Sequence, residues 1–168
     1  MKKPKEQLIS YIALGAPATR RPASGNLPFL RPEIGFTPNW FHRNLGIDFD
    51  ETYHMDPAYR KQSQKIMREE IDRRFPGCNI GKHDDENTPD LLTGLFGACS
   101  VAAIYGVPVR YQKDQWPTSE HVHISEEEMA SIRPPNLETN LFFQSIMDQV
   151  EWIARNEGKV YGFINWQG

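Results

Sequence analysis

The stretch from Asp90 to Arg110 carries no charged residue between its two ends, and this uncharged run constrains the fold more than any other feature of the sequence. Leaving so much apolar surface in water would forfeit roughly 25 cal/mol for each Å². Glycines interrupt the run and a proline stops it, which distinguishes it from a membrane span of about 20 apolar residues. The run therefore predicts the centre of a hydrophobic core.

The residues of this run predict a helix that ends at a glycine and a proline and is followed by a short strand. Gly94 and Gly97 would share one face of the helix, where the missing side chains let another backbone approach closely. Gly106 and Pro108 would end the helix, and residues 107–111 would form a buried strand.

Length, charge and cysteine content limit the class of protein. The chain has 168 residues, which suits one domain with a sizeable core. A net charge of -3 argues against a nucleic-acid partner and against an anionic membrane surface. The only cysteines are Cys78 and Cys99, so we expect no disulfide framework and a cytoplasmic protein. Glu6 and Gln7 interrupt the apolar stretch that a signal peptide would require.

Helices are expected on the N-terminal side of the run. Residues 4–14 predict a short helix, and residues 15–38, which are rich in proline and glycine, predict an irregular layer. Asp56 followed by Pro57 predicts the start of a helix that continues to about Arg74. Its apolar stripe would consist of Tyr59, Ile66, Met67, Ile71 and Phe75.

The C-terminal part predicts two further helices and a strand. Ser125 begins a capping-box pattern with a glutamate three residues later. The last helix would be capped by Thr139 or Asn140 and would end at Gly158, and residues 159–168 would form a buried strand. An amphipathic helix followed by an apolar strand, repeated, is typical of α/β folds with parallel strands, which place functional groups at strand ends.

The order of several motifs resembles the uroporphyrinogen decarboxylase-like superfamily. These motifs are WFHRNLG, then AAIYGVPVRY followed by DQWP, then ISEEEMASI, a long helix and GFINWQG. The superfamily includes the decarboxylase of haem synthesis and cobalamin-dependent methyltransferases that work with corrinoid proteins or coenzyme M. The resemblance covers residues from about 20 to the C-terminus.

What the resemblance implies is an α/β fold, the (β/α)8 TIM barrel, for which about 250 residues are typical. Residues 1–168 would then be a single domain that holds only the N-terminal portion of the barrel, with an irregular N-terminal layer. We expect a partner chain to complete the barrel if the natural protein is this short.

Two positions distinguish the branches of this superfamily. The decarboxylases have a motif like W-F-M-R-Q-A-G-R, whose two arginines hold the carboxylates of the porphyrinogen. Arg43 matches the first arginine, but Ile47 stands where the second is expected, and isoleucine cannot pair with a carboxylate. The decarboxylases also place an aspartate after an early strand, for which Asp114 is the candidate. The missing arginine favours the methyltransferase-like branch, or an uncharacterised one, over porphyrinogen decarboxylation.

The methyltransferases of this superfamily activate a thiol on zinc held by histidine and cysteine, because the bound thiolate accepts the methyl group. The resemblance places those ligands in the C-terminal half of the barrel, which we do not expect in this chain. Zinc and cobalamin are thus implied for the full-length family, and no cofactor is predicted to bind this chain. The expected partners are a small molecule or a corrinoid-protein substrate.

Other candidate metal ligands have simpler interpretations. His121 and His123 would share one face of a strand, but no cysteine lies beside them at ligand spacing, so an exposed loop or edge is preferred. His83 and the acidic residues 84–86 lack the spacing and the glycine of a calcium loop, which favours a solvated loop. Cys99, inside the apolar run, is expected to be a small buried side chain. No metal site is predicted.

Six residues are predicted to bind substrate, and no catalytic residue is assigned. They are Trp40, His42 and Arg43 in the first motif, Asp114 after the central strand, and Asn165 and Gln167 after the last strand. An arginine and two amides can orient a polar or anionic ligand, and a tryptophan can give it an apolar wall. The structural alternative is that Trp40 is core, Arg43 pairs with Asp48 or Asp50, and Asp114 is a turn residue.

Two classes of function remain open. The first is part of an enzyme for methyl transfer involving a corrinoid or a thiol acceptor, with uroporphyrinogen decarboxylation in porphyrin biosynthesis as its alternative. The second is a non-catalytic binding module.

Overall fold

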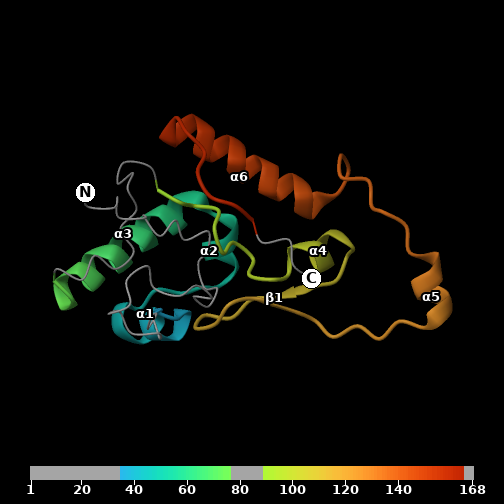
Figure 1. Ribbon diagram of the computed structural model, residues 1–168, viewed down its shortest axis with the longest axis horizontal. Coiled ribbons are helices and arrows are strands. Elements are labelled where there is room, and N and C mark those ends of the chain that lie inside the picture. Colours follow the sequence, from blue (N-terminus) through green and yellow to red (C-terminus); the bar gives the residue numbers. More distant parts are fainter. Residues whose placement is uncertain (1–34, 77–88, 165–168) are drawn as a thin grey trace, which may run out of the picture. The chain divides into compact units, whose positions relative to one another are not determined.

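A computed structural model of the chain describes residues 35–76 and 89–164 (Figure 1). The chain divides into two units, Met1–Phe36 and Thr37–Gly168, and almost all the described residues belong to the second. The helix predicted at residues 4–14 and nearly all of the irregular layer predicted at residues 15–38 lie outside the described residues.

Helices predominate in the described part of the second unit. In chain order its elements are α1 (Pro38–Leu45), α2 (Glu51–Met55), α3 (Pro57–Arg74), α4 (Ser100–Ile104), β1 (Val109–Arg110), β2 (Thr118–Ser119), α5 (Glu126–Ser131) and α6 (Leu141–Glu157). The two strands pair antiparallel, with Val109 opposite Ser119. No parallel pair occurs among the described residues. The partial (β/α)8 barrel therefore stays a prediction.

The predicted starts and stops of the longer helices are confirmed. The Asp56 carboxylate accepts hydrogen bonds from the first turn of α3, and Pro57 occupies its first position. Asn140 caps α6, which ends at Gly158 in the left-handed conformation, with φ 70°. The capping box at Ser125 is also present at the start of α5.

The uncharged run does form the centre of the core. A single cluster of buried side chains joins this run to α6 and to the C-terminal segment, and it consists of Leu91, Leu92, Leu95, Phe96, Ile146, Ile153 and Ile164. The strand predicted for residues 159–168 is not formed by residues 159–164, although Ile164 is buried.

The helix predicted through Gly94 and Gly97 is wrong for the first part of the run. Residues 92–98 form turns, and only α4 is helical. Gly94 and Gly97 have φ of 78° and 57°, values that a helix does not contain and that glycine adopts without strain. The Asp90 carboxylate stabilises the first turn by accepting hydrogen bonds from the backbone N–H groups of Leu92 and Thr93. The predicted close approach at Gly97 is not required by its surroundings, since an added Cβ would lie in ordinary contact, 3.5 Å from the Pro117 carbonyl oxygen.

A buried arginine ties the core together. Arg60 on α3 is 2% exposed, and its guanidinium donates to four oxygen atoms from three parts of the chain. Nε donates to the Leu91 carbonyl at 2.8 Å, Nη1 to the carbonyls of Tyr53 and His54 at 2.8 and 3.3 Å, and Nη2 to Oε1 of Gln149 at 2.7 Å. Burial lowers the pKa of Arg60 to about 10.

The core-facing stripe of α3 therefore differs from the predicted one. Its buried residues are Pro57, Arg60, Ser63 and Met67. Ile66 and Phe75, which were predicted to face the core, are exposed. Hydropathy favoured the apolar side chains, but an arginine whose three nitrogen atoms each donate to backbone or amide oxygens can occupy the interior.

A buried histidine lies beside this arginine. The Nδ1 atom of His54 accepts a hydrogen bond from the Phe96 N–H at 3.2 Å, and its ring packs against the rings of Phe96, Tyr111 and Trp116. His54 Nε2 is one of three buried side-chain atoms without a hydrogen-bond partner among the described residues; the others belong to Ser100 and Gln149. Burial, with the nearby charge of Arg60, lowers the pKa of His54 to about 4.

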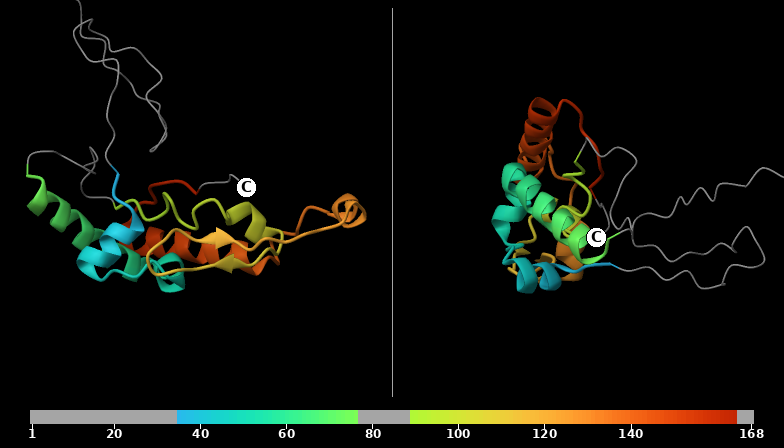
Figure 2. Two further views of the ribbon diagram at one scale, coloured as in Figure 1. Left: turned by 90° about the horizontal axis from the view of Figure 1, so that it is seen from below. Right: turned by 90° about the vertical axis from the view of Figure 1, so that its left-hand side faces the viewer.

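The segment between β2 and α6 extends away from this core. Residues 120–134 are all exposed, and α5 lies at the tip of the excursion in Figure 1 and in the left view of Figure 2. We call residues 120–139 the α5 arm. None of the helices in the described residues combines the length and the hydropathy that crossing a bilayer requires.

Replacing Arg60 should destabilise the fold strongly. Arg60→Met keeps most of the side-chain volume but removes every donor, which leaves the buried oxygens of Leu91, Tyr53 and Gln149 unpaired. We expect a loss of about 3 kcal/mol in the free energy of unfolding, measured by urea denaturation. Lys65→Met is the matched control, because Lys65 forms an exposed ion pair with Glu69 on the same helix and should cost less than about 1 kcal/mol. Equal losses would contradict the role of Arg60.

Acid should destabilise the fold through His54. Its pKa is about 4 in the folded chain and 6.5 for the free side chain, so the unfolded chain takes up the proton first as pH falls. The contribution of neutral His54 is complete above pH 6.5 and is lost as pH falls towards 4, where the loss reaches about 3 kcal/mol. In the His54→Asn variant the side-chain oxygen can still accept from the Phe96 N–H, but the loss of unfolding free energy between pH 6.5 and 4 should be smaller by the share of His54. If unfolding free energy depends on pH equally in the two proteins, His54 does not contribute to the acid sensitivity.

Candidate ligand-binding site on helix α1

Helix α1 presents three polar side chains on one face. Thr37 caps its start, and Gly46 ends it in the left-handed conformation with φ 68°. Asn39, His42 and Arg43 are spaced by three and four positions, so they share a face, whereas Phe41 is buried on another. Two of these three residues, His42 and Arg43, belong to the predicted site.

Asp114 lies against this face, as a shared site requires. Its Oδ2 accepts a hydrogen bond from Nδ2 of Asn39 at 2.8 Å, across 75 positions of sequence. The neighbouring backbone is fixed as well, since the Phe49 N–H donates to the Lys113 carbonyl at 2.8 Å. The loop at residues 112–116 is therefore held to the segment that follows α1.

His42 has a defined orientation. Its Nδ1 lies 3.0 Å from Oδ1 of Asp48 and 3.2 Å from the carbonyl oxygen of Ile47. A carboxylate and a carbonyl can only accept, so Nδ1 must carry the proton. In the neutral ring Nε2 then holds the lone pair.

Asp48 is shared between an ammonium group and an imidazole ring. The ammonium of Lys113 donates to its Oδ2 at 2.7 Å, while Oδ1 faces His42. These contacts, the hydrogen bond from Lys113 first, lower the pKa of Asp48 below its usual value. Asp48 is thus a carboxylate at neutral pH.

Arg43 is exposed and makes no hydrogen bond or ion pair with the described residues. The alternative pairing with Asp48 or Asp50 is not formed. Asp48 binds His42 and Lys113, and the Asp50 carboxylate caps α2 by accepting from the Thr52 N–H. The guanidinium of Arg43 can therefore pair with an anion from solution.

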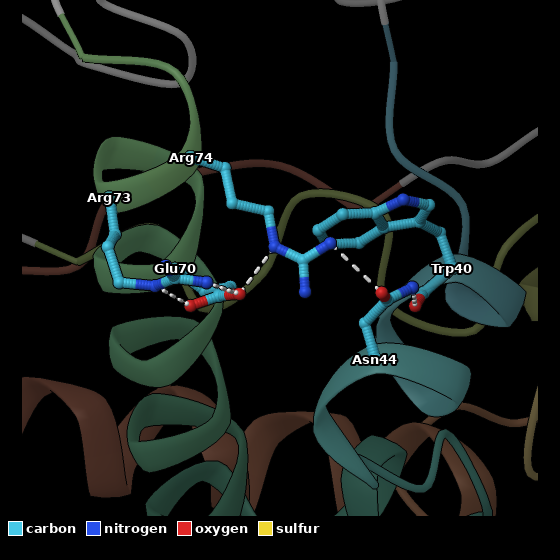
Figure 3. A network of polar contacts seen from close by, with 5 residues as sticks. All are labelled: Trp40, Asn44, Glu70, Arg73 and Arg74. Atoms are coloured by element: carbon cyan, nitrogen blue, oxygen red, sulfur yellow. Dashed lines mark hydrogen bonds and ion pairs between the residues drawn. The ribbon is translucent and has the colours of Figure 1, made fainter.

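Trp40 belongs to a separate cluster on the side of α1 that faces α3 (Figure 3). The guanidinium carbon of Arg74 lies 5.0 Å from the centre of its ring, and Arg74 also donates to Asn44 at 3.0 Å. Glu70 accepts from Arg73 and Arg74, and the contacts with these two arginines, Arg73 first, lower its pKa to about 2. Trp40 is thus engaged with α3, and its role as the apolar wall of a ligand stays a prediction.

Two predicted site residues remain, together with three residues that the sequence analysis considered and set aside. Asn165 and Gln167 lie outside the described residues. His121 and His123 are exposed on the α5 arm, and the Cys99 thiol is buried and donates to the Pro117 carbonyl at 3.3 Å. Within residues 35–76 and 89–164 no three potential metal ligands come together.

Three residues of the site were missed by sequence analysis. Asn39 lies one turn before the predicted pair on α1, and helical spacing alone would have found it. Asp48 and Lys113 had no comparable signal, because their pairing depends on the approach of two loops 65 positions apart. The α1 site consists of Asn39, His42, Arg43, Asp48, Lys113 and Asp114.

No protein-family model, curated protein or solved structure matches this chain. The resemblance to the uroporphyrinogen decarboxylase-like superfamily therefore rests on the short motifs alone, and the chemistry of the α1 site rests on the contacts of its own residues.

Removing Lys113 should change the ionisation of Asp48. Lys113→Ala is expected to raise the pKa of Asp48 towards its usual value of 3.8, because the lysine is the largest cause of the lowering. The carboxyl carbon can be titrated by NMR. Lys65→Ala is the control, since Lys65 pairs with Glu69 on α3 instead. An unchanged Asp48 titration in Lys113→Ala would contradict the pairing.

Proposed function

We propose that this chain is the substrate-binding part of a uroporphyrinogen decarboxylase-like enzyme that transfers a methyl group, with a corrinoid or a thiol as partner in the reaction. The observation that carries the proposal is the contact between Asp114 and α1. Asp114 and the pair His42–Arg43 were selected from motifs far apart in sequence, and Asn39 holds Asp114 at 2.8 Å on the helix that carries the pair.

The charges of the α1 site support an anionic ligand. Arg43 offers a guanidinium without a protein partner among the described residues, and Asp48 is neutralised by Lys113 at 2.7 Å. The remaining carboxylate, Asp114, is hydrogen-bonded to an amide and can accept an N–H or O–H from a ligand. Such a site favours a small molecule with one anionic end and one donor group.

Uroporphyrinogen decarboxylation is the alternative, because an arginine and an aspartate on one face are also what a porphyrinogen would need. The position of Ile47 weighs against it. Its side chain is 5% exposed and packs in the interior, so this position does not present a group to a ligand. A second carboxylate of a porphyrinogen would lack the arginine that the decarboxylases provide there.

A cytoplasmic location is part of the proposal. Cys99 is a free thiol, and a reducing compartment would keep it so.

A methyl-transfer assay tests the proposal. The chain is incubated with methylcobalamin and a small anionic thiol, and mass spectrometry follows the methyl thioether. Arg43→Ala and Asp114→Ala should each lower the rate by about tenfold to hundredfold, because the ligand loses its orientation. Arg68→Ala is the control, since Arg68 is exposed on α3 and lies outside the α1 site.

Absence of methyl thioether with the unaltered chain would contradict methyl transfer by residues 1–168 on their own. An equal loss of rate in Arg68→Ala would contradict the role of Arg43 and Asp114. Release of carbon dioxide from uroporphyrinogen, sensitive to Arg43→Ala, would establish the alternative in its place.

A further inference from the structure

We infer that His42 is the proton-transferring residue of the α1 site, and that Asp48 and Lys113 are positioning residues that direct its Nε2 towards the ligand. The assignment of His42 as a base rests on its own contacts. The identity of the proton donor, a thiol that accepts the methyl group, rests on the proposed function.

The tautomer of His42 is set by its two partners. Asp48 Oδ1 at 3.0 Å and the Ile47 carbonyl oxygen at 3.2 Å both face Nδ1, and neither can donate a hydrogen bond. The proton of the neutral ring is therefore on Nδ1, and Nε2 is a lone-pair acceptor. A carboxylate behind an imidazole fixes the ring and stabilises the cation that forms when Nε2 takes a proton.

Asp48 is itself held firmly. It lies between Ile47 and Phe49, which are 5% and 2% exposed, and its carbonyl oxygen accepts from the Tyr59 hydroxyl at 3.4 Å. Lys113 holds the carboxylate from the other side at 2.7 Å. The segment that orients His42 is thus anchored at its backbone and at its side chain.

The position of His42 suits proton transfer from a ligand bound at Arg43 to Nε2. Its side chain is 34% exposed, and the next residue on α1 is Arg43, which has no partner among the described residues. When the thiol of the acceptor approaches Nε2, its S–H bond breaks, the proton moves to Nε2, and the electron pair stays on sulfur as a thiolate. The imidazolium later returns its proton to water. The guanidinium of Arg43 can hold the anionic end of the same molecule.

The other described histidines do not share this arrangement. His54 is buried, and its Nδ1 accepts from the Phe96 N–H, so it has the opposite tautomer. His121 and His123 are exposed on the α5 arm and have no carboxylate partner among the described residues. These three rings therefore serve as internal references in one spectrum.

The tautomer can be measured without any substrate. In the protein labelled with ¹⁵N at histidine, long-range ¹H–¹⁵N spectra at neutral pH should show His42 with a protonated Nδ1 and an unprotonated Nε2. Asp48→Ala should shift the ring towards the Nε2-protonated form that free histidine prefers. Lys113→Arg should retain the native tautomer, because a guanidinium can also hold Asp48. Lys65→Ala is the control that should leave the spectrum unchanged.

The role in catalysis is measured by the pH profile of methyl transfer. Loss of the base in His42→Gln should lower kcat at neutral pH by about a hundredfold and flatten the acid limb of the profile. Asp48→Ala should lower kcat by about tenfold with a smaller change in KM, and Lys113→Arg should restore the rate lost in Lys113→Ala. A folded His42→Gln variant is verified by its unfolding midpoint.

Each outcome decides one claim. An Nε2-protonated His42 in the unaltered protein overturns the inference, whatever the activity. If His42 is protonated at Nδ1 in the unaltered protein but the His42→Gln variant keeps full activity, the inference is overturned as well, while methyl transfer stands. If the tautomer is as expected and no methyl thioether forms, the orientation of His42 is upheld and the proposed function fails.

Discussion

The fold depends on satisfying one buried guanidinium. Arg60 connects the end of α2, the beginning of the uncharged run and the middle of α6 through four hydrogen bonds, and no carboxylate is among these partners in the described residues. Burying a cation costs desolvation free energy, and this cost is offset only when the nitrogen atoms of the cation donate hydrogen bonds inside the protein. The positions of Leu91 and Gln149 are therefore coupled, although they lie 58 residues apart. Partial formation of the core would leave a charge unsatisfied, which favours an all-or-none transition.

The α1 site is built on an extension of this core. The ring of Phe49 lies 4.5 Å from that of Tyr53 and 5.8 Å from that of Trp116, measured between centres. These aromatic contacts connect the loop after α1 with α2 and with the loop at residues 112–116. Polar groups on loops are most precise when the loops themselves are packed, and here both loops are. The geometry of Asp48, Lys113 and Asp114 thus follows from aromatic packing beneath them.

Sequence alone predicted the local features of the fold better than the long-range ones. Caps at Asp56, Ser125 and Asn140 were found because each depends on residues a few positions apart. The helix through Gly94 was predicted from the apolar content of the run. Gly94 and Gly97 have left-handed backbone conformations, which a helix cannot contain. Hydropathy gives no information on the φ angle, so the pattern could not predict these turns. In the site, Arg43 and Asp114 were selected by resemblance, whereas Asp48 was considered only as a partner of Arg43. Its actual pairing with Lys113 joins two loops, and no pattern within either loop predicts it.

The α5 arm is exposed, and its contacts are largely its own. The side-chain hydrogen bonds of residues 125–136 stay within the arm, and its apolar side chains, among them Val122, Met129 and Ile132, are exposed. Neither Arg60 nor the α1 site depends on it for a contact. The tip of the arm is consequently a suitable place to graft an epitope or a fluorophore, because an insertion there would report on the molecule while leaving its interior and its polar face as they are.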